Sequence, residues 1–345
     1  MNRTEANRFG WVVEIDPFRP RSKPIKRTAL GRIKHEGALF AESSAGHAVI
    51  YSGDDENREY FYKFVSRRPW REVRARGLSP LRDGTLHVAR FNPDGTGEWV
   101  PLQMGTGPFT PANGWVDQGD IVLRTRRAAD AVGATRLDRP EWATVHPGTQ
   151  EVFLTLTNGT SGPNAVNPRN PNPYGHIVKI WHDGGDHGLT TFHWDIWILA
   201  GDPFYDPGVT LGPDSMFGSP DGLWIDPDGR MWIQTDISNS SQNRADRGYD
   251  RIGNNAMLGA DPVTKEIRRF LVGPRGCEIT GVITTPDQRT MFVNVQHPGE
   301  DTNYWGTPTP ANPRVVSNWP DFSPTGRPRS ATLVIRKTDG GVIGT

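Results

Sequence analysis

The sequence predicts an all-β fold, and two observations support this class. The 345 residues include 30 Pro, 39 Gly and 12 Trp, a composition typical of short aromatic strands separated by tight turns. Apolar runs such as residues 151–158, 230–236 and 290–296 alternate with polar turn segments along the chain. The best helical periodicity lies at residues 120–134, so we expect at most one short helix there and strands elsewhere.

Four similar hairpins predict that the strands form a β-propeller. Three of them begin near an acidic residue, turn at a segment containing proline and return as a strand centred on an aromatic residue; they span residues 139–158, 219–236 and 278–296. Residues 35–55 have the same layout without the proline. Antiparallel repeats of this kind are typical of propeller blades. Because four hairpins are few for a closed ring, we expect an incomplete or open propeller, formed by residues 1–345 as a single domain.

The hairpins predict an acidic site on the propeller axis. In a propeller the first strand of each blade lines the central channel, which would direct Glu36, Glu141, Asp221 and Glu278 towards one mouth. Converging carboxylates repel one another, and a bound polyvalent cation relieves the repulsion. Oxygen ligands suit calcium, whereas added His or thiolate ligands would admit iron or zinc. The alternative is that each acid caps a turn or pairs with a nearby Arg.

The segment LGRIKHEGAL, residues 30–39, predicts a phosphate-binding group next to this acidic site. Arg32, Lys34 and Glu36 alternate with apolar and His residues, so on a strand they would share one face. Two cations beside a metal-binding carboxylate are the combination that a phosphate oxyanion needs. The alternative is an edge strand with a solvated charged face.

Other polar clusters have two interpretations each. Residues 54–56, 182–193 and 247–255 fit turns or polar loops, although the last could also supply oxygen ligands or phosphate donors at the channel mouth. Cys277 is a candidate ligand beside Glu278, or a small buried apolar residue. Polar residues 294–300 follow a predicted strand, and we expect His297 and Glu300 among them to shape the site.

Charge and motifs exclude several function classes. The 39 basic and 39 acidic side chains balance without a block of like charge, so nothing favours nucleic acid or an anionic membrane as a partner. We find no run of 18 apolar residues and no secretory signal in the polar residues 1–10. The single cysteine excludes an internal disulfide, and motifs of P-loop enzymes, α/β-hydrolases and common zinc sites are absent.

Five blocks in order resemble the C-terminal half of the PhoX-type alkaline phosphatases. These blocks are residues 7–38, 51–66, 138–158, 217–236 and 276–300. The resemblance implies a six-bladed propeller with calcium and iron in its channel that hydrolyses small phosphomonoesters at alkaline pH. It also implies a periplasmic or extracellular location, whereas the chain as written would be cytoplasmic if complete.

The resemblance carries over to particular residues. Glu36 matches a metal-binding glutamate of the family, and Lys34 with Arg32 falls where the family places its phosphate-binding basic group. Glu141, Asp221 and Glu278 begin blocks similar to those with further metal ligands. The N-terminal half of the family chain, with its additional ligands, has no counterpart here, so we expect an impaired metal centre unless self-association or the missing half completes it.

Two other functions agree with these residues. The segment 219–236 also resembles strand pairs of calcium-dependent lactonase-like propeller hydrolases. A non-catalytic calcium-binding propeller fragment is the second alternative.

Overall fold

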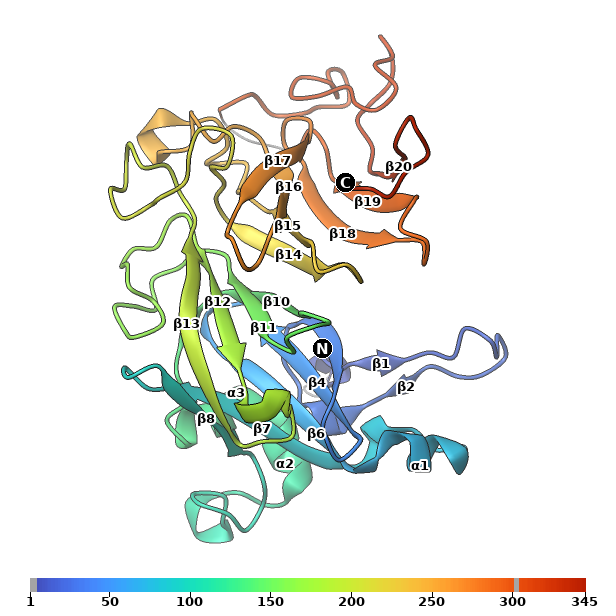
Figure 1. Cartoon of the computed structure of the whole chain (residues 1–345), viewed down its shortest axis with the longest axis vertical. Coiled ribbons are helices and arrows are strands. Elements are labelled where there is room, and N and C mark those ends of the chain that lie inside the picture. The colour runs from blue at the N-terminus through green and yellow to red at the C-terminus, as the bar shows by residue number, and fades with distance from the viewer. Residues whose placement is uncertain (1–4, 301–303) are drawn as a thin grey trace.

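The computed structural model describes residues 5–300 and 304–345, and strands dominate it (Figure 1). The first blade contains β3 (His35–Glu42), β4 (His47–Asp54), β6 (Phe61–Pro69), β7 (Gly84–Phe91) and β8 (Thr96–Pro101). The second contains β10 (Pro140–Val145), β11 (Val152–Leu156), β12 (His176–Trp181) and β13 (Thr191–Leu199). Strand β13 pairs with β8, so these two blades form one nine-stranded sheet.

Two further sheets complete the arrangement. The third blade contains β14 (Pro220–Ile225), β15 (Met231–Thr235), β16 (Ala256–Ala260) and β17 (Ile267–Val272). The fourth contains β18 (Glu278–Thr284), β19 (Met291–Gln296) and β20 (Ala331–Ile335). All pairings in the four blades are antiparallel, and each predicted hairpin forms the first two strands of one blade.

Short elements lie before, within and between the blades. Two small sheets pair β1 (Val13–Glu14) with β2 (Ile25–Lys26), and β5 (Asn57–Glu59) with β9 (Leu137–Asp138). The α-helices are α1 (Trp70–Ala75), α2 (Gln118–Leu123) and α3 (Thr125–Ala131). The 3-10 turns are η1 (Glu5–Arg8), η2 (Thr28–Leu30), η3 (Pro80–Arg82), η4 (Pro111–Asn113), η5 (Asp183–Gly185) and η6 (Ala245–Arg247). No helix in the described part of the chain is long and apolar enough to cross a membrane.

The first strands of the blades stand next to one another, as in a propeller. Strands β3 and β4 contact β10, β10 and β11 contact β14, and β14 and β15 contact β18. The blades therefore follow one another in an arc with β3 and β18 at its ends (Figure 1). The prediction of an all-β, propeller-like fold is confirmed.

Apolar side chains between the blades hold this arrangement. Phe153 of β11 packs edge-to-face on Trp197 of β13, with ring centroids 5.8 Å apart, and the same cluster includes Leu223 and Ile233 of the third blade. A second cluster joins Tyr51 of the first blade to several strands of the second. Burial of apolar area from two blades at once makes their packing mutually dependent.

Two local predictions are wrong. Residues 120–134 were expected to hold at most one helix but contribute to two, α2 and α3. The two helices are separate because Arg124 between them has φ −107° and ψ 41°, outside helical geometry. Helix α1 was not predicted.

Residues 30–39 are not one strand, since β3 begins only at His35. Before it the chain bends after Gly31, whose φ is +83°, and the Arg32 amide donates to Val122 O at 2.9 Å. Arg32, Lys34 and Glu36 therefore do not share a strand face.

Removal of the Phe153 side chain should test the packing between the second and third blades. Phe153 is fully buried, so Phe153→Ala should lower the free energy of unfolding by about 3–5 kcal/mol. Phe18 is 92% exposed, and Phe18→Ala serves as the matched control with an expected change within about 0.5 kcal/mol. Urea unfolding measures both, and equal losses would contradict this account of the core.

Candidate metal centre

The structure gathers the four acids that the hairpins predicted. Glu36, Glu141 and Asp221 are each the second residue of their inner strand, and Glu278 is the first residue of β18. Burial, then the charges of Asp55 and Glu278, raises the pKa of Glu36. Burial and surrounding carboxylates, including Glu278 and Glu36, raise the pKa of Asp221 well above its usual value. The four acids therefore share one electrostatic site, while their role as metal ligands stays a prediction.

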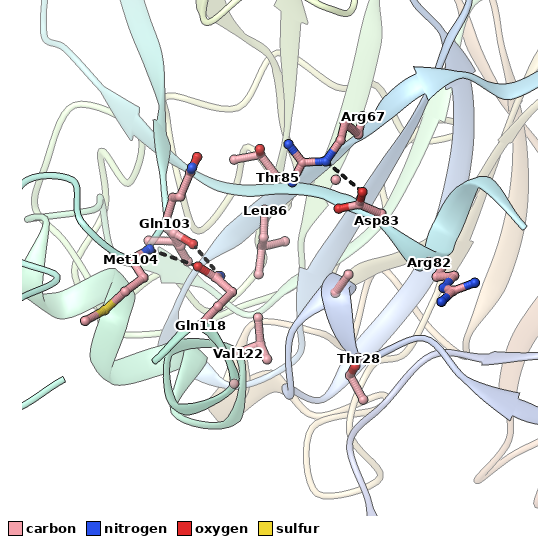
Figure 2. Close-up of a pocket in the computed structure, with 14 residues that line it drawn as sticks. Thr28, Arg67, Arg82, Asp83, Thr85, Leu86, Gln103, Met104, Gln118 and Val122 are labelled. Atoms are coloured by element: carbon pink, nitrogen blue, oxygen red, sulfur yellow. Dashed lines mark hydrogen bonds and ion pairs between the residues drawn. The ribbon is translucent and has the colours of Figure 1, made fainter. Parts of the chain in front are cut away.

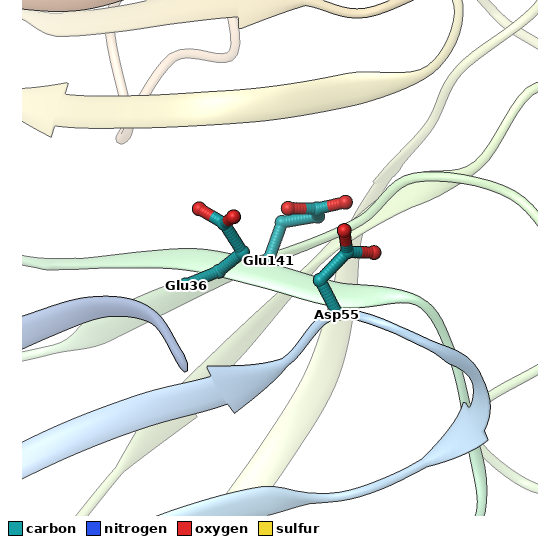
Figure 3. Close-up of side chains that lie close together, drawn as sticks. All are labelled: Glu36, Asp55 and Glu141. Atoms are coloured by element: carbon teal, nitrogen blue, oxygen red, sulfur yellow. The ribbon is translucent and has the colours of Figure 1, made fainter. Parts of the chain in front are cut away.

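Three carboxylates from the first two blades lie closest together. One oxygen atom from each of Glu36, Asp55 and Glu141 lies within 4.8 Å of the other two, and the side chains point into the same space (Figure 3). Burial, then the charges of Asp221 and Asp55, raises the pKa of Glu141. Repulsion between carboxylates this close is relieved either by a proton, which the raised pKa of Glu141 favours in the metal-free protein, or by a cation bound among them. The set of carboxylate oxygens fits a hard cation such as calcium.

Asp55 is the member of this group that sequence reasoning placed in a plain turn. Its neighbour Asp54 is the last residue of β4, is fully buried, and accepts a hydrogen bond from Arg126 Nε at 2.7 Å. Successive side chains at a strand end point in opposite directions, so Asp55 is directed to the acidic site. In the sequence, Asp55 could have been identified as a site residue only from its position directly after the second strand of a predicted hairpin.

Arg139 is a second residue that sequence reasoning missed. Its Nε donates to Asp55 Oδ1 at 2.8 Å, and its Nη2 donates to Glu141 Oε1 at 2.7 Å. Burial raises the pKa of Asp55, but the hydrogen bonds with Arg139 and Glu141 and the charge of Arg139 outweigh it and leave this pKa lowered. The backbone of Arg139 has φ +51°, a left-handed conformation that is strained for a residue other than glycine. A half-buried cation thus lies directly against two of the three clustered carboxylates.

The two predicted phosphate-binding residues occupy different places. Lys34 is exposed, its Nζ forms an ion pair with Glu56, and its charge contributes to the lowered pKa of Asp55. The guanidinium of Arg32 donates to the carbonyl oxygens of Ala6 at 2.6 Å and Phe9 at 3.0 Å. The structure therefore brings Lys34 near the carboxylates and binds Arg32 to the N-terminal segment. Their function as phosphate-binding groups stays a prediction.

His297 is the residue after β19 that contacts the acid of the fourth blade. Its Nε2 lies 3.5 Å from Glu278 Oε2, and its Nδ1 lies 3.3 Å from Glu300 Oε2. The hydrogen bond to Glu278, followed by the charge of Glu300, raises the pKa of His297 to about 9 despite its partial burial. A positively charged His297 stabilises the Glu278 carboxylate next to Asp236 at the channel mouth.

The remaining sequence candidates have structural partners. Cys277 is fully buried in an apolar cluster, and burial raises its pKa to about 12, which disfavours a thiolate ligand. His182 and His187 are buried against Tyr51 of the first blade. In the 247–255 segment, Arg251 Nη1 forms an ion pair with Asp202 at 3.0 Å.

A cavity of about 420 Å³ on the first blade lies apart from the acids (Figure 2). Arg67 Nε forms an ion pair with Asp83 at 2.7 Å, and Met104 N donates to Gln118 Oε1 at 2.9 Å. Several of its polar groups are therefore already paired with protein partners, and none of the three clustered carboxylates lines it.

A propeller-like arc with carboxylates gathered at the starts of its inner strands defines a candidate metallohydrolase. The family model described as alkaline phosphatase PhoX matches residues 1–299. The chain belongs to the PhoX alkaline phosphatase family.

One solved structure gives the same result. The structure of Pseudomonas fluorescens PhoX in complex with vanadate, a transition state analogue, is 45% identical to this chain, with a TM-score of 0.88. The match covers 98% of this chain and 59% of that one, so the chain spans less than two thirds of the length of this relative. Kuenenia stuttgartiensis hydrazine synthase matches at 13% identity and a TM-score of 0.35, over 89% of this chain and 65% of that chain, and supports no argument. No curated protein matches the sequence.

Calcium should stabilise the folded protein. The clustered carboxylates would bind it only when folded, so a free calcium concentration 100-fold above Kd should add about 2.7 kcal/mol to the free energy of unfolding. Glu141→Gln should reduce this gain, whereas Asp83→Asn, on the cavity of Figure 2, should retain it. Thermal unfolding with calcium and with chelator measures the effect. Equal gains in both variants would place calcium elsewhere.

The metal-free protein should lose stability as pH rises through the range in which Asp236 titrates. Burial, then the charge of Glu278, raises the pKa of Asp236 to about 6 from 3.8. The folded state therefore holds this proton more tightly, and the contribution of Asp236 to stability falls between about pH 4 and pH 6. Asp236→Asn should remove this part of the decline in Tm.

The measurement is thermal unfolding in chelator at a series of pH values. Asp83→Asn is the control, and its Tm should follow the unsubstituted protein. A Tm profile of Asp236→Asn with the original slope would show that Asp236 does not titrate in this way.

Proposed function

We propose that this chain is a metal-dependent phosphomonoesterase, an alkaline phosphatase of the PhoX type. The observation that carries the proposal is the juxtaposition of Glu36, Asp55 and Glu141 with the half-buried cation Arg139. Carboxylates that can hold a metal, together with a guanidinium, match the needs of a phosphate ester, which requires positive charge around its oxygens. The 45% identity to a PhoX studied with vanadate supports the same chemistry.

The clustered carboxylates would hold the metal, with Asp221 and Glu278 as further ligands from the third and fourth blades. Calcium is the ion that the oxygen-only set favours, and iron is proposed from the family resemblance. When bound, the metal supplies positive charge that neutralises the carboxylates and polarises a phosphate oxygen. Because Glu36, Asp55 and Glu141 come from the first two blades, this part of the centre does not depend on a closed ring.

The basic side chains would bind the phosphate group. Arg139 has a planar guanidinium whose Nε and Nη2 donate to Asp55 and Glu141, which fixes its orientation. Its remaining N–H donors would bind phosphate oxygens and stabilise the negative charge that develops on them. Lys34 is exposed on the same side and would attract the dianionic substrate. His297 would hold the Glu278 side chain in position through their contact at 3.5 Å.

The proposal includes a small-molecule phosphomonoester as the partner and a periplasmic or extracellular location. Both follow from membership of the family rather than from a contact in the structure. Self-association, or association with a segment equivalent to the rest of the longer relative, would supply any further ligands.

Turnover of p-nitrophenyl phosphate tests the proposal. With calcium and iron supplied at alkaline pH, Glu36→Gln and Arg139→Lys should each lower kcat/KM by at least about 100-fold, because they remove a ligand and an oriented donor. Arg67→Lys, in the cavity of Figure 2, is the matched control. Vanadate should inhibit the unsubstituted protein.

Three outcomes would contradict the proposal. A metal-loaded protein without phosphomonoesterase activity would be evidence against it. Bound calcium without turnover would favour the non-catalytic propeller, and hydrolysis of lactones unaffected by phosphate would favour the lactonase alternative.

A further inference from the structure

A polar cavity of about 400 Å³ lies at the mouth where the acids gather. Segments on both sides of the acidic residues line it. Asn57 follows Asp55 by two residues, Ser219 precedes Asp221 by two, and Ser238 is two residues after Asp236.

One hydrogen bond and one electrostatic influence connect the cavity with the acidic site. The backbone of Asp236 donates to Ser219 O at 3.0 Å, which ties one wall of the cavity to an acid. Burial raises the pKa of Tyr249, another lining residue, and the charge of Asp236 adds to this shift. The cavity is therefore next to the candidate phosphate site and separate from it.

The walls of this cavity are hydroxyl and amide groups held in fixed positions. Asn57 Nδ2 donates to Thr160 Oγ1 at 3.0 Å, and Thr160 N donates to Asn57 Oδ1 at 3.0 Å. Ser219 Oγ lies 3.1 Å from the hydroxyl of Tyr249, which donates to Pro173 O at 2.6 Å. None of the lining residues is acidic. Fixed hydroxyls and amides recognise a ligand that offers several hydroxyl groups.

Two lining side chains keep their hydrogen-bonding capacity. Within residues 5–300 and 304–345, neither the exposed guanidinium of Arg247 nor the hydroxyl of Ser241 forms a hydrogen bond or an ion pair with a protein side chain, although the charge of Arg247 acts on the neighbouring Asp246. Arg247 is the residue of the 247–255 segment that lines the cavity, whereas Arg251 is paired with Asp202. Unpaired donors beside a fixed polar wall can bind the hydroxyl oxygens of a ligand.

We infer that this cavity binds the alcohol part of the phosphomonoester and selects a polyhydroxylated alcohol, such as a sugar or a polyol. The inference rests on the proposed function, because it places the ester phosphate at the carboxylates and Arg139. Arg247 and Ser241 are then specificity-determining residues that donate to ligand hydroxyls. The volume of about 400 Å³ is within the range of small-molecule sites.

The experiment compares two substrates in the full chain loaded with calcium and iron. Glucose 6-phosphate presents several hydroxyl groups, and p-nitrophenyl phosphate presents none. Arg247→Gln and Ser241→Ala should lower the ratio of kcat/KM for glucose 6-phosphate to that for p-nitrophenyl phosphate by about tenfold, the loss expected for one hydrogen bond to a substrate hydroxyl. Arg127→Gln, an exposed arginine of α3 outside the cavity, should keep the ratio.

Each outcome bears on one of the two proposals. An unchanged ratio in both cavity variants would overturn the inference, even with full phosphatase activity. If the unsubstituted protein hydrolyses neither substrate, the proposed function fails, and calorimetric titration with glucose 6-phosphate then tests the cavity alone. Binding that is about tenfold weaker in Arg247→Gln than in Arg127→Gln would support the cavity, and equal binding or none would overturn it.

Discussion

Repulsion among carboxylates is the constraint on which the rest of this structure depends. Packing of the blades directs Glu36, Glu141, Asp221 and Glu278 to one mouth, and burial there raises the pKa of Glu36, Glu141 and Asp221, because it makes their negative charges costly. Arg139 reduces part of this repulsion because its guanidinium donates hydrogen bonds to Asp55 and to Glu141. One guanidinium cannot neutralise several carboxylates, so protons remain bound in the metal-free protein, and under the proposed function a bound cation would replace them.

The core between blades is what maintains this geometry. Glu36 and Asp55 belong to the first blade and Glu141 to the second, so their separation depends on how those two blades pack. The pairing of β8 with β13 and the shared apolar cluster around Tyr51 hold the two blades together. Electrostatics at the mouth and apolar burial behind it therefore oppose each other, and the burial is extensive enough to hold the acids in place.

The mouth of the arc combines two environments of different polarity. The carboxylates with Arg139 form a highly charged region suited to a metal and a phosphate. The neighbouring cavity has hydroxyl and amide walls, with Arg247 as its unpaired cation among the described residues. A phosphomonoester has the same division, because its phosphate is charged and its alcohol is neutral. Under the two proposals, the charged region would bind the phosphate of such a substrate and the neighbouring cavity would bind its alcohol.

The sequence by itself determined the repeated features: the all-β class, the four hairpins, and the acids that begin their inner strands. These are local patterns, and equivalent positions in a repeat occupy equivalent positions in space. Asp55 and Arg139 could not be found in this way, because each occurs once and acquires its role only when the first and second blades meet. The strand predicted through Arg32 and Lys34 failed because contacts with distant residues, Val122 among them, bend the chain after Gly31. Only the tertiary structure decides such features, since each depends on groups that are far apart in the chain and adjacent in space.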